Sequence, residues 1–389
     1  MNAYSFLTRS SAAHGDAVII RENAKTFAYA DLARESARHA ALFASLGLAP
    51  GERVAAQLDG SAQSLFLYFG VLRAGLVFVP IPPAAGDAET ARIVGDAAPR
   101  IIVCAPDGEA AMRGRARGLK DVRVYTLGSS GDTSGTLHAA LPASAEFAAA
   151  ARSEDDLALI HYAPGRPGVM LSHANLTVNA AALATAWGIT ASDTLLDCLP
   201  EAELAVLNAV VLAGASMRID RRPDVKRLIN RLADETVLLG TAHLYEQLLA
   251  DPALTAEACR PLRLCIANGA LLTAATFNAF QLRSDHALVA YYSVAEGGIV
   301  TSSPLDGERR AGKVGLRLRE HKLRVVGPNL KPMPFDHVGD IVLQGPNVCK
   351  GYWNNPGLTA AAIQPDGWFR TSDTGYWDED GYITLADRD

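Results

Sequence analysis

Arg166 is the charged residue of a short loop whose other members are glycine and proline, Gly165–Gly168. A guanidinium group in an exposed loop can bind a phosphate through its N–H donors. The stretch Ala163–Gly168 carries no serine, threonine or lysine, and its two prolines, Pro164 and Pro167, offer no backbone N–H. Taken without context, the four residues Gly165–Gly168 predict a tight turn between two strands.

Other residues with chemical potential are better explained by structure. The five cysteines lack the paired spacing of a metal site or a disulfide framework, which predicts buried thiols. Glu201 and Glu203 precede an apolar helical run and predict a solvated helix start. For His173 we expect a structural role, with Ser172 or Asn175 capping the next helix.

Composition and charge exclude several classes of protein. The 389 residues are 49% hydrophobic and 20% charged, enough to bury a large core. The formal net charge of -6 comes from interspersed charges, so no basic stripe is available for nucleic acid. The N-terminus lacks a signal-peptide core, and no apolar run is long enough for a membrane helix. We therefore expect a cytoplasmic protein that binds neither nucleic acid nor membrane.

The elements that must position these residues fall into three parts. Residues 1–150 alternate helical stretches with short apolar strands, and residues 151–311 resume this alternation after a linker rich in glycine, serine, threonine and alanine. Such alternation predicts parallel sheets covered by helices. Residues 312–389 contain short alternating strands with glycine turns, which predict a small antiparallel barrel or sandwich.

The C-terminal run from Gly339 carries the features by which the chain resembles a known family. Its GYW turn, its FRTSD element and its final strand are similar to those of the adenylate-forming (ANL) superfamily of acyl-CoA synthetases, and the matching positions are Gly351, Tyr352, Trp353, Gly367, Trp368, Arg370, Thr371, Asp373, Gly375, Gly381, Tyr382 and Arg388. Residues 26–81 are most similar to the malonyl-CoA synthetase branch. The resemblance covers nearly the whole chain.

This resemblance implies an α/β fold. Two parallel sheets flanked by helices would form a layered αβαβα body, followed by a small antiparallel β-barrel subdomain. The three parts are then a first α/β subdomain at 1–150, a second at 151–311 and a small β subdomain at 312–389. The chain stops at Asp389, about where the family has its hinge. We therefore expect the C-terminal lid domain of the family to be absent.

The resemblance also implies a nucleotide site for ATP or AMP. Asp373 corresponds to the carboxylate that accepts hydrogen bonds from the ribose hydroxyls, and Arg388 to an arginine near the same ribose or phosphate. Tyr292 would lie over the adenine face, and Glu296 would hold Mg²⁺ through an oxygen. The backbone of Asn268, Gly269 and Ala270 would form the wall beside the nucleotide.

Several positions depart from the family pattern. Ala295 stands where the family has a threonine that binds the α-phosphate, and the loop around Arg166 is short and lacks the hydroxyls and lysine of the family loop. The segment of Glu201 and Glu203 lacks the family histidine. Tyr291 replaces an arginine of the malonyl-CoA synthetase branch, which favours an apolar or small neutral acyl group over a dicarboxylate.

Two hypotheses about function follow from these matches and departures. In the first, the chain is an acyl-CoA synthetase-like adenylation domain that is impaired in ATP use, with Glu296 and Arg166 as its remaining phosphate-handling groups. Its partners would be a small carboxylic acid and either coenzyme A or an acyl-carrier protein. In the second, it is an inactive pseudo-adenylation domain that serves as a structural or docking module of a polyketide or peptide synthase.

Overall fold

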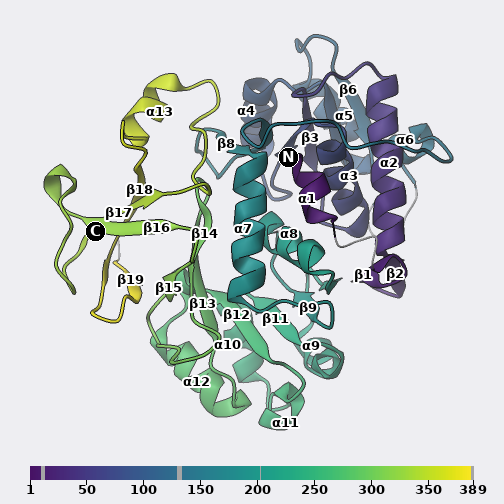
Figure 1. Ribbon diagram of the computed structural model, residues 1–389. Helices are drawn as coiled ribbons and strands as arrows, with labels where there is room; N and C mark the ends of the chain where they lie inside the picture. Colours follow the sequence, from purple (N-terminus) through teal and green to yellow (C-terminus); the bar gives the residue numbers. More distant parts are fainter. Residues whose placement is uncertain (10–13, 129–133, 202, 387–389) are drawn as a thin grey trace. The chain divides into compact units, whose positions relative to one another are not determined.

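The computed structural model describes residues 1–9, 14–128, 134–201 and 203–386. It contains two compact units, drawn with their helices and strands in Figure 1. The first consists of Met1–Thr177 and Cys349–Thr359, and the second of Val178–Val348 and Ala360–Asp389. This division does not test the three parts expected from the sequence, which stay a prediction.

The first unit is built around a sheet with the strand order β6-β5-β3-β4-β7-β8. Neighbours from β6 to β7 are parallel, and β8 is an antiparallel edge strand. All four residues of β5 are buried, as expected for a strand covered on both faces. The strands of this sheet are β3 (Arg53–Gln57), β4 (Val77–Pro80), β5 (Ile101–Cys104), β6 (Arg123–Thr126), β7 (Leu157–His161) and β8 (Val169–Ser172). The unit also contains the antiparallel hairpin of β1 (Val18–Glu22) and β2 (Lys25–Ala28).

Helices cover both faces of this sheet. Ile93 of α4 and Met112 of α5 pack into one core cluster with strand residues such as Val79. On the opposite face, the ring of Tyr68 in α3 lies 5.2 Å from that of Phe78 in β4, in an edge-on arrangement that aromatic pairs favour. The helices of this unit are α1 (Ala3–Leu7), α2 (Tyr29–Ser45), α3 (Ala62–Arg73), α4 (Asp87–Ala97), α5 (Glu109–Arg115) and α6 (Thr136–Ala140).

The second unit contains a sheet with the order β15-β14-β13-β12-β11-β9-β10. The neighbours from β13 to β10 are parallel, whereas β14 and β15 add antiparallel pairing at one edge. The strands are β9 (Thr194–Asp197), β10 (Ser216–Ile219), β11 (Val237–Gly240), β12 (Leu264–Asn268), β13 (Val289–Val294), β14 (Gly298–Ser302) and β15 (Leu316–Arg317). The helices between them are α8 (Leu204–Ala213), α9 (Val225–Arg231), α10 (Ala242–Ala250), α11 (Ala256–Cys259) and α12 (Ala274–Ser284).

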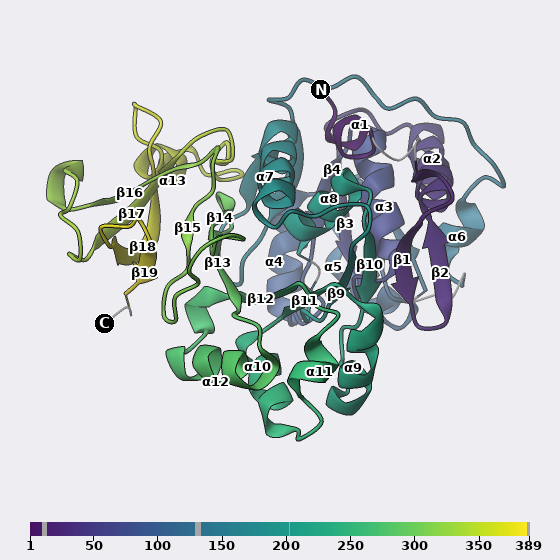
Figure 2. The same ribbon diagram turned by 60° about the horizontal axis from the view of Figure 1, so that its bottom comes forward.

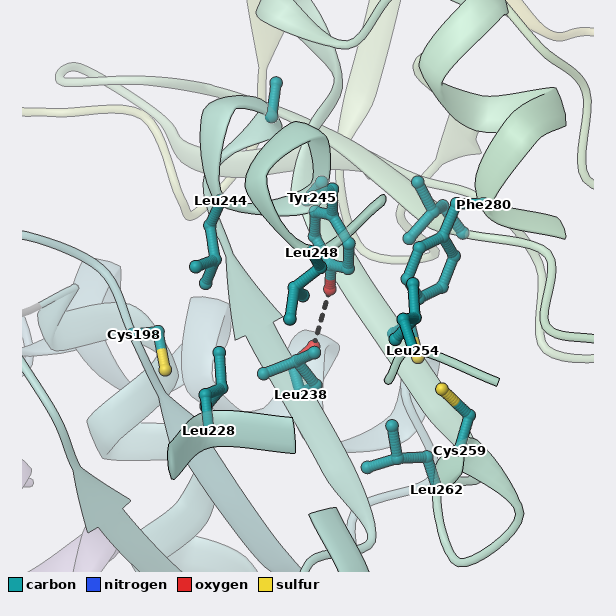
Figure 3. Close-up of a cluster of buried hydrophobic side chains, with 14 of the residues drawn as sticks. Cys198, Leu228, Leu238, Leu244, Tyr245, Leu248, Leu254, Cys259, Leu262 and Phe280 are labelled. Carbon is teal, nitrogen blue, oxygen red and sulfur yellow. Dashed lines mark hydrogen bonds between the residues drawn. The ribbon is translucent and has the colours of Figure 1, made fainter. Parts of the chain in front are cut away.

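Helices α9 to α12 lie together on one face of this sheet, as Figure 2 shows. They bury a cluster of leucines and aromatic residues around Tyr245 (Figure 3). The Tyr245 hydroxyl donates to the carbonyl oxygens of Leu238, at 3.1 Å, and Ile266, at 3.0 Å. A buried tyrosine hydroxyl therefore finds an acceptor inside an otherwise apolar core.

A small antiparallel sheet completes the second unit. Its strands pair in the order β16-β17-β18-β19 and form a curled half-barrel. Leu323 and Ile341 of this sheet pack against Tyr292 and Val300 of the larger sheet. The strands are β16 (Lys322–Val326), β17 (Gly339–Gln344), β18 (Phe369–Trp377) and β19 (Ile383–Leu385).

The expected fold class is confirmed: both larger sheets are mainly parallel and flanked by helices, and the last part of the chain forms an antiparallel sheet. The remaining helices are α7 (His173–Ala186) and α13 (Pro356–Ala362). Among the helices that the structure describes, none is both long enough and apolar enough to span a bilayer.

Candidate functional site

Asp373 and Tyr292 are brought together in the second unit, where β18 passes the end of β13. The Tyr292 hydroxyl donates to Oδ2 of Asp373 at 2.7 Å. Tyr292 is only 3% exposed. Burial, reinforced by the hydrogen bond to the Asp373 carboxylate, raises the pKa of the Tyr292 hydroxyl, so the hydroxyl stays protonated and remains a donor.

The backbone around Asp373 is held by a neighbouring threonine that sequence reasoning assigned no role. The Thr371 hydroxyl donates to the carbonyl oxygen of Ile341 at 2.7 Å, which ties β18 to β17. The same hydroxyl oxygen accepts from the backbone N–H of Asp373 at 3.2 Å. Asp373 is thus positioned through both its side chain and its backbone.

The expected wall segment lies beside this pair, because β12 and β13 are parallel neighbours in which Asn268 is opposite Tyr291. Oδ1 of Asn268 accepts from the backbone N–H of Ala270 at 3.0 Å and caps a short 3-10 turn. A Cβ added at Gly269 would come within 2.8 Å of Val314 and 3.1 Å of Ala290. Glycine is therefore required there by close packing, and Ala270 is exposed at the surface.

Glu296 lies in the turn between β13 and β14 and is half-buried. Two buried asparagines bind the backbone of this turn and of the start of β14. Nδ2 of Asn347 donates to the carbonyl oxygen of Gly297 at 3.0 Å, and Nδ2 of Asn179 in α7 donates to that of Ile299 at 2.8 Å. Sequence reasoning did not identify either asparagine, because side-chain amides that bind distant backbone leave no local pattern.

Arg166 belongs to the first unit, where its loop connects β7 and β8. Ala163 to Arg166 form a turn in which the N–H of Arg166 donates to the carbonyl oxygen of Ala163 at 2.9 Å. Pro164 and Gly165 occupy the central positions, and Gly165 has a φ of +67°. Proline followed by a glycine with positive φ is typical of a type II turn. A tight turn is therefore present, but it spans Ala163–Arg166 and begins two residues before the Gly165–Gly168 turn expected from the sequence.

Few backbone donors remain in this loop. Pro164 and Pro167 have no N–H, and the N–H of Arg166 closes the turn. The N–H of Gly165 donates to Oε1 of Glu89 in α4 at 3.1 Å. The N–H groups of Gly165 and Arg166 are thus already bound within the protein, whereas a phosphate cradle presents such groups to the ligand.

The segment that lacks the family histidine differs from expectation. Glu201 is exposed, as predicted, but Glu203 is half-buried at the start of α8. Burial raises the pKa of Glu203 to about 7. The prediction of a solvated helix start was wrong for Glu203, because the apolar helix that it precedes is buried against the sheet and takes the side chain with it.

Tyr291 is fully enclosed. It is 2% exposed, and its ring centroid lies 6.0 Å from that of Trp187, which follows α7. Nε1 of Trp187 in turn donates to the hydroxyl oxygen of Ser302 at 2.9 Å. Where the malonyl-CoA synthetase branch has an arginine, this chain has a buried aromatic residue packed against Trp187.

The structural roles predicted for His173 and the cysteines are confirmed. Oδ1 of Asn175 accepts from the N–H of Ser172 at 2.7 Å, and Nδ1 of His173 accepts from the N–H of Ala3 at 3.1 Å. All five cysteines are free and buried. Arg388, predicted near the ribose, lies outside the described residues.

The similarity of this chain to known proteins extends over residues of both units. The profile of the AMP-binding enzyme family matches residues 7–353. A sulfoacetate–CoA ligase from Cupriavidus necator is 32% identical over 362 residues, which cover 89% of this chain and 70% of the ligase. A feruloyl-CoA synthase from an Amycolatopsis species is 28% identical over 385 residues, covering 96% of this chain and 75% of the synthase.

A solved structure is similar over the full length of the chain. The crystal structure of ATP-bound MatB from Rhodopseudomonas palustris superposes with a TM-score of 0.95 at 33% identity, covering 100% of this chain and 78% of MatB. MatB is a malonyl-CoA synthetase. The similarity to the malonyl-CoA synthetase branch that residues 26–81 predicted is therefore confirmed.

Proposed function

Since the chain belongs to the AMP-binding enzyme family of acyl-CoA synthetases, we propose that it is an adenylation domain that binds the AMP end of a nucleotide but is impaired in using ATP. The observation that carries the proposal is the loop Ala163–Gly168. The N–H of Arg166 closes the turn of this loop, and the N–H of Gly165 is bound to Glu89. The two prolines of the loop have no N–H to offer a phosphate.

The nucleoside end is the better preserved part. Asp373 is the carboxylate that we assign to the ribose hydroxyls, with Tyr292 bound to its Oδ2. A carboxylate bridging a diol forms charge-assisted hydrogen bonds, which are stronger than neutral ones. We assign Tyr292 to the adenine face, the backbone of Asn268, Gly269 and Ala270 to the wall beside the nucleotide, and Arg388 to the ribose or phosphate.

The phosphate end is the impaired part. Forming an acyl-adenylate requires that the leaving pyrophosphate be held by donors aimed at its charge, each commonly worth about 2.7 to 4 kcal/mol. Ala295 offers no hydroxyl, and the loop offers neither hydroxyls nor a lysine. Two such losses imply a slowing on the order of ten-thousandfold. Arg166, exposed beyond the turn, and Glu296 are the groups left to act there.

Glu296 is the residue that we assign to Mg²⁺. No cluster of three or more metal-binding side chains occurs among the described residues. Mg²⁺ that accompanies a nucleotide keeps several waters and uses one or two carboxylates together with the phosphates. A single carboxylate on a turn braced by Asn347 and Asn179 fits this requirement. The ion would supply charge neutralisation to the phosphates.

For the acyl side we propose a small carboxylic acid, with coenzyme A or an acyl-carrier protein as the thiol. The enclosed, aromatic surroundings of Tyr291 favour an apolar or small neutral acyl group over a second carboxylate. If the impairment is complete, the same fold would serve as a docking module of a polyketide or peptide synthase. The observation that favours this second candidate is that the Gly165 N–H of the phosphate loop is already bound to Glu89.

Two measurements on the chain test the proposal. Calorimetric titration should show that AMP binds, and ATP–pyrophosphate exchange over a panel of carboxylic acids should be lower than that of MatB by about four orders of magnitude. Exchange within about tenfold of MatB would overturn the impairment. Failure to bind either AMP or ATP would remove the adenylation proposal and leave the docking role.

A further inference from the structure

Glu89 in α4 is hydrogen-bonded both to Arg92 of the same helix and to the loop that follows β7. Oε1 of Glu89 accepts from the N–H of Gly165 at 3.1 Å and from Nη2 of Arg92 at 2.7 Å. Oε2 accepts from Nε of Arg92 at 2.8 Å. The carboxylate therefore receives one backbone amide and a two-pronged guanidinium contact, which fixes its position.

Helix α4 holds this loop at a second point. The Tyr162 hydroxyl, at the start of the loop, donates to Oδ2 of Asp96 at 2.7 Å. The guanidinium carbon of Arg92 also lies 5.5 Å from the centroid of the Tyr162 ring. The first and third turns of α4 are thus both bound to the loop, so the contact between Glu89 and Gly165 is part of a supported arrangement.

The donors that Glu89 receives are those that an oxyanion needs. Phosphate oxygens bind to backbone N–H groups and to arginine through the same geometry that a carboxylate uses. The hydrogen bonds from Arg92 hold the pKa of Glu89 below its usual range, so the carboxylate stays charged at neutral pH. The residues Pro164, Gly165 and Arg166 are exposed, so a dissolved anion can reach the loop.

We propose that Glu89 is an internal anion that determines which ligands the loop accepts, by occupying Gly165 and Arg92 and repelling a phosphoryl group. The inference deepens the proposed impairment in ATP use and rests on it for the ligand class. It differs in its cause: the missing hydroxyls weaken phosphate binding, whereas Glu89 actively competes with it. Removing the charge of Glu89 should then restore part of the lost affinity.

The test uses pyrophosphate as its probe, because this anion needs no nucleoside contact. Pyrophosphate is titrated calorimetrically at low ionic strength into the unmodified chain and into Glu89→Gln, which keeps the shape of the side chain. We expect Glu89→Gln to bind at least about tenfold more tightly, since the substitution removes the like charge that repels the anion, and a neutral amide oxygen holds the Gly165 N–H and Arg92 less strongly than a carboxylate does. Adding Arg92→Gln to this variant should abolish the gain.

Glu109→Gln is the matched control, because Glu109 pairs with Arg113 of its own helix as Glu89 pairs with Arg92. An affinity change in the control equal to that of Glu89→Gln would reduce the effect to net charge and overturn the proposal. Unchanged affinity in Glu89→Gln would also overturn it. Glu89→Ala provides a second variant if the first melts at a lower temperature than the unmodified chain.

AMP titrated into the same samples separates this inference from the proposed function. Tighter pyrophosphate binding without any AMP binding would support the role of Glu89 and remove the nucleotide proposal. AMP binding together with an unchanged pyrophosphate affinity in Glu89→Gln would support the nucleotide proposal and overturn the role of Glu89.

Discussion

The hydroxyl oxygen of Tyr292 lies 2.7 Å from Oδ2 of Asp373, although 81 positions of sequence separate the two residues. Tyr292 is on β13 of the larger sheet of the second unit, and Asp373 is on β18 of the small curled sheet. Because one carboxylate oxygen is bound to the protein, the orientation of the other is restricted. This pair is the part of the candidate site on which the nucleoside predictions depend.

Replacing Tyr292 with phenylalanine should weaken AMP binding. The change removes one hydrogen bond to Asp373, worth about 0.5 to 1.5 kcal/mol, which corresponds to roughly 2- to 12-fold in the dissociation constant. Calorimetric titration of AMP and of 2′-deoxy-AMP measures it. The loss should be smaller for the deoxynucleotide, which already lacks one ribose hydroxyl. Tyr382→Phe, which removes a hydroxyl bound to the carbonyl oxygen of Glu308, is the control and should leave both affinities unchanged.

The variant Asp373→Ala should lose more affinity than Tyr292→Phe. It removes a charged partner of the ribose hydroxyls, at a cost of about 1.5 to 3 kcal/mol. A dissociation constant for AMP equal to that of the unmodified chain would show that the ribose assignment is wrong. Asp366→Ala changes an exposed carboxylate elsewhere in the second unit and should bind AMP as the unmodified chain does.

Acidification should destabilise the protein between pH 6.5 and about 4 through three buried histidines. Burial lowers the pKa of His39, His173 and His321 to about 4. In the unfolded chain they titrate near 6.5, so the unfolded state binds protons first as the pH falls. Their stabilising contribution is complete above pH 6.5 and is lost towards pH 4, at most about 3 kcal/mol for each.

Urea unfolding at a series of pH values measures this dependence. His39→Gln should show a weaker fall in the free energy of unfolding on acidification, and the exposed His337→Gln should follow the unmodified chain. Glu203 acts in the opposite sense, because burial raises its pKa to about 7, so that its protonation below pH 7 favours the folded state. A free energy of unfolding that rises continuously from pH 6.5 to 4 would contradict the prediction.

Gly70 should tolerate no side chain, because α2 and α3 approach closely there. A Cβ at Gly70 would lie 2.4 Å from Cβ of His39, so Gly70→Ala should cost about 1 to 3 kcal/mol through overpacking. The matched control is Gly95→Ala in α4, where nothing lies within 4 Å of the added Cβ. That variant should be neutral or more stable by about 0.5 to 1 kcal/mol, since alanine favours helix. Thermal or urea unfolding of both variants measures the two changes in the free energy of unfolding. Equal changes in the two variants would contradict the overpacking predicted at Gly70.

Local patterns in the sequence were sufficient for the elements and for several positions within them. Short apolar runs ended by glycine or proline predicted the buried strands, and the glycine and proline content of Gly165–Gly168 predicted a tight turn in this loop, although the turn lies at Ala163–Arg166. The sequence predicted Ser172 or Asn175 as the cap of α7, and the structure shows that each side chain binds the backbone N–H of the other residue. These features are determined by neighbours along the chain, which a sequence displays directly.

Contacts between distant segments were decided by the tertiary structure. The sequence could not show that Glu89 binds the amide of Gly165, that Tyr292 binds Asp373, or that Asn179 braces the turn of Glu296. Nor could it show that Glu203 is half-buried. Each depends on how helices and sheets pack, and the same polar side chain is solvated or enclosed according to the surface placed over it. The sequence by itself determined the fold class and the family to which the chain belongs. Packing decided which hydrogen-bond donors and acceptors of the candidate site are already bound within the protein.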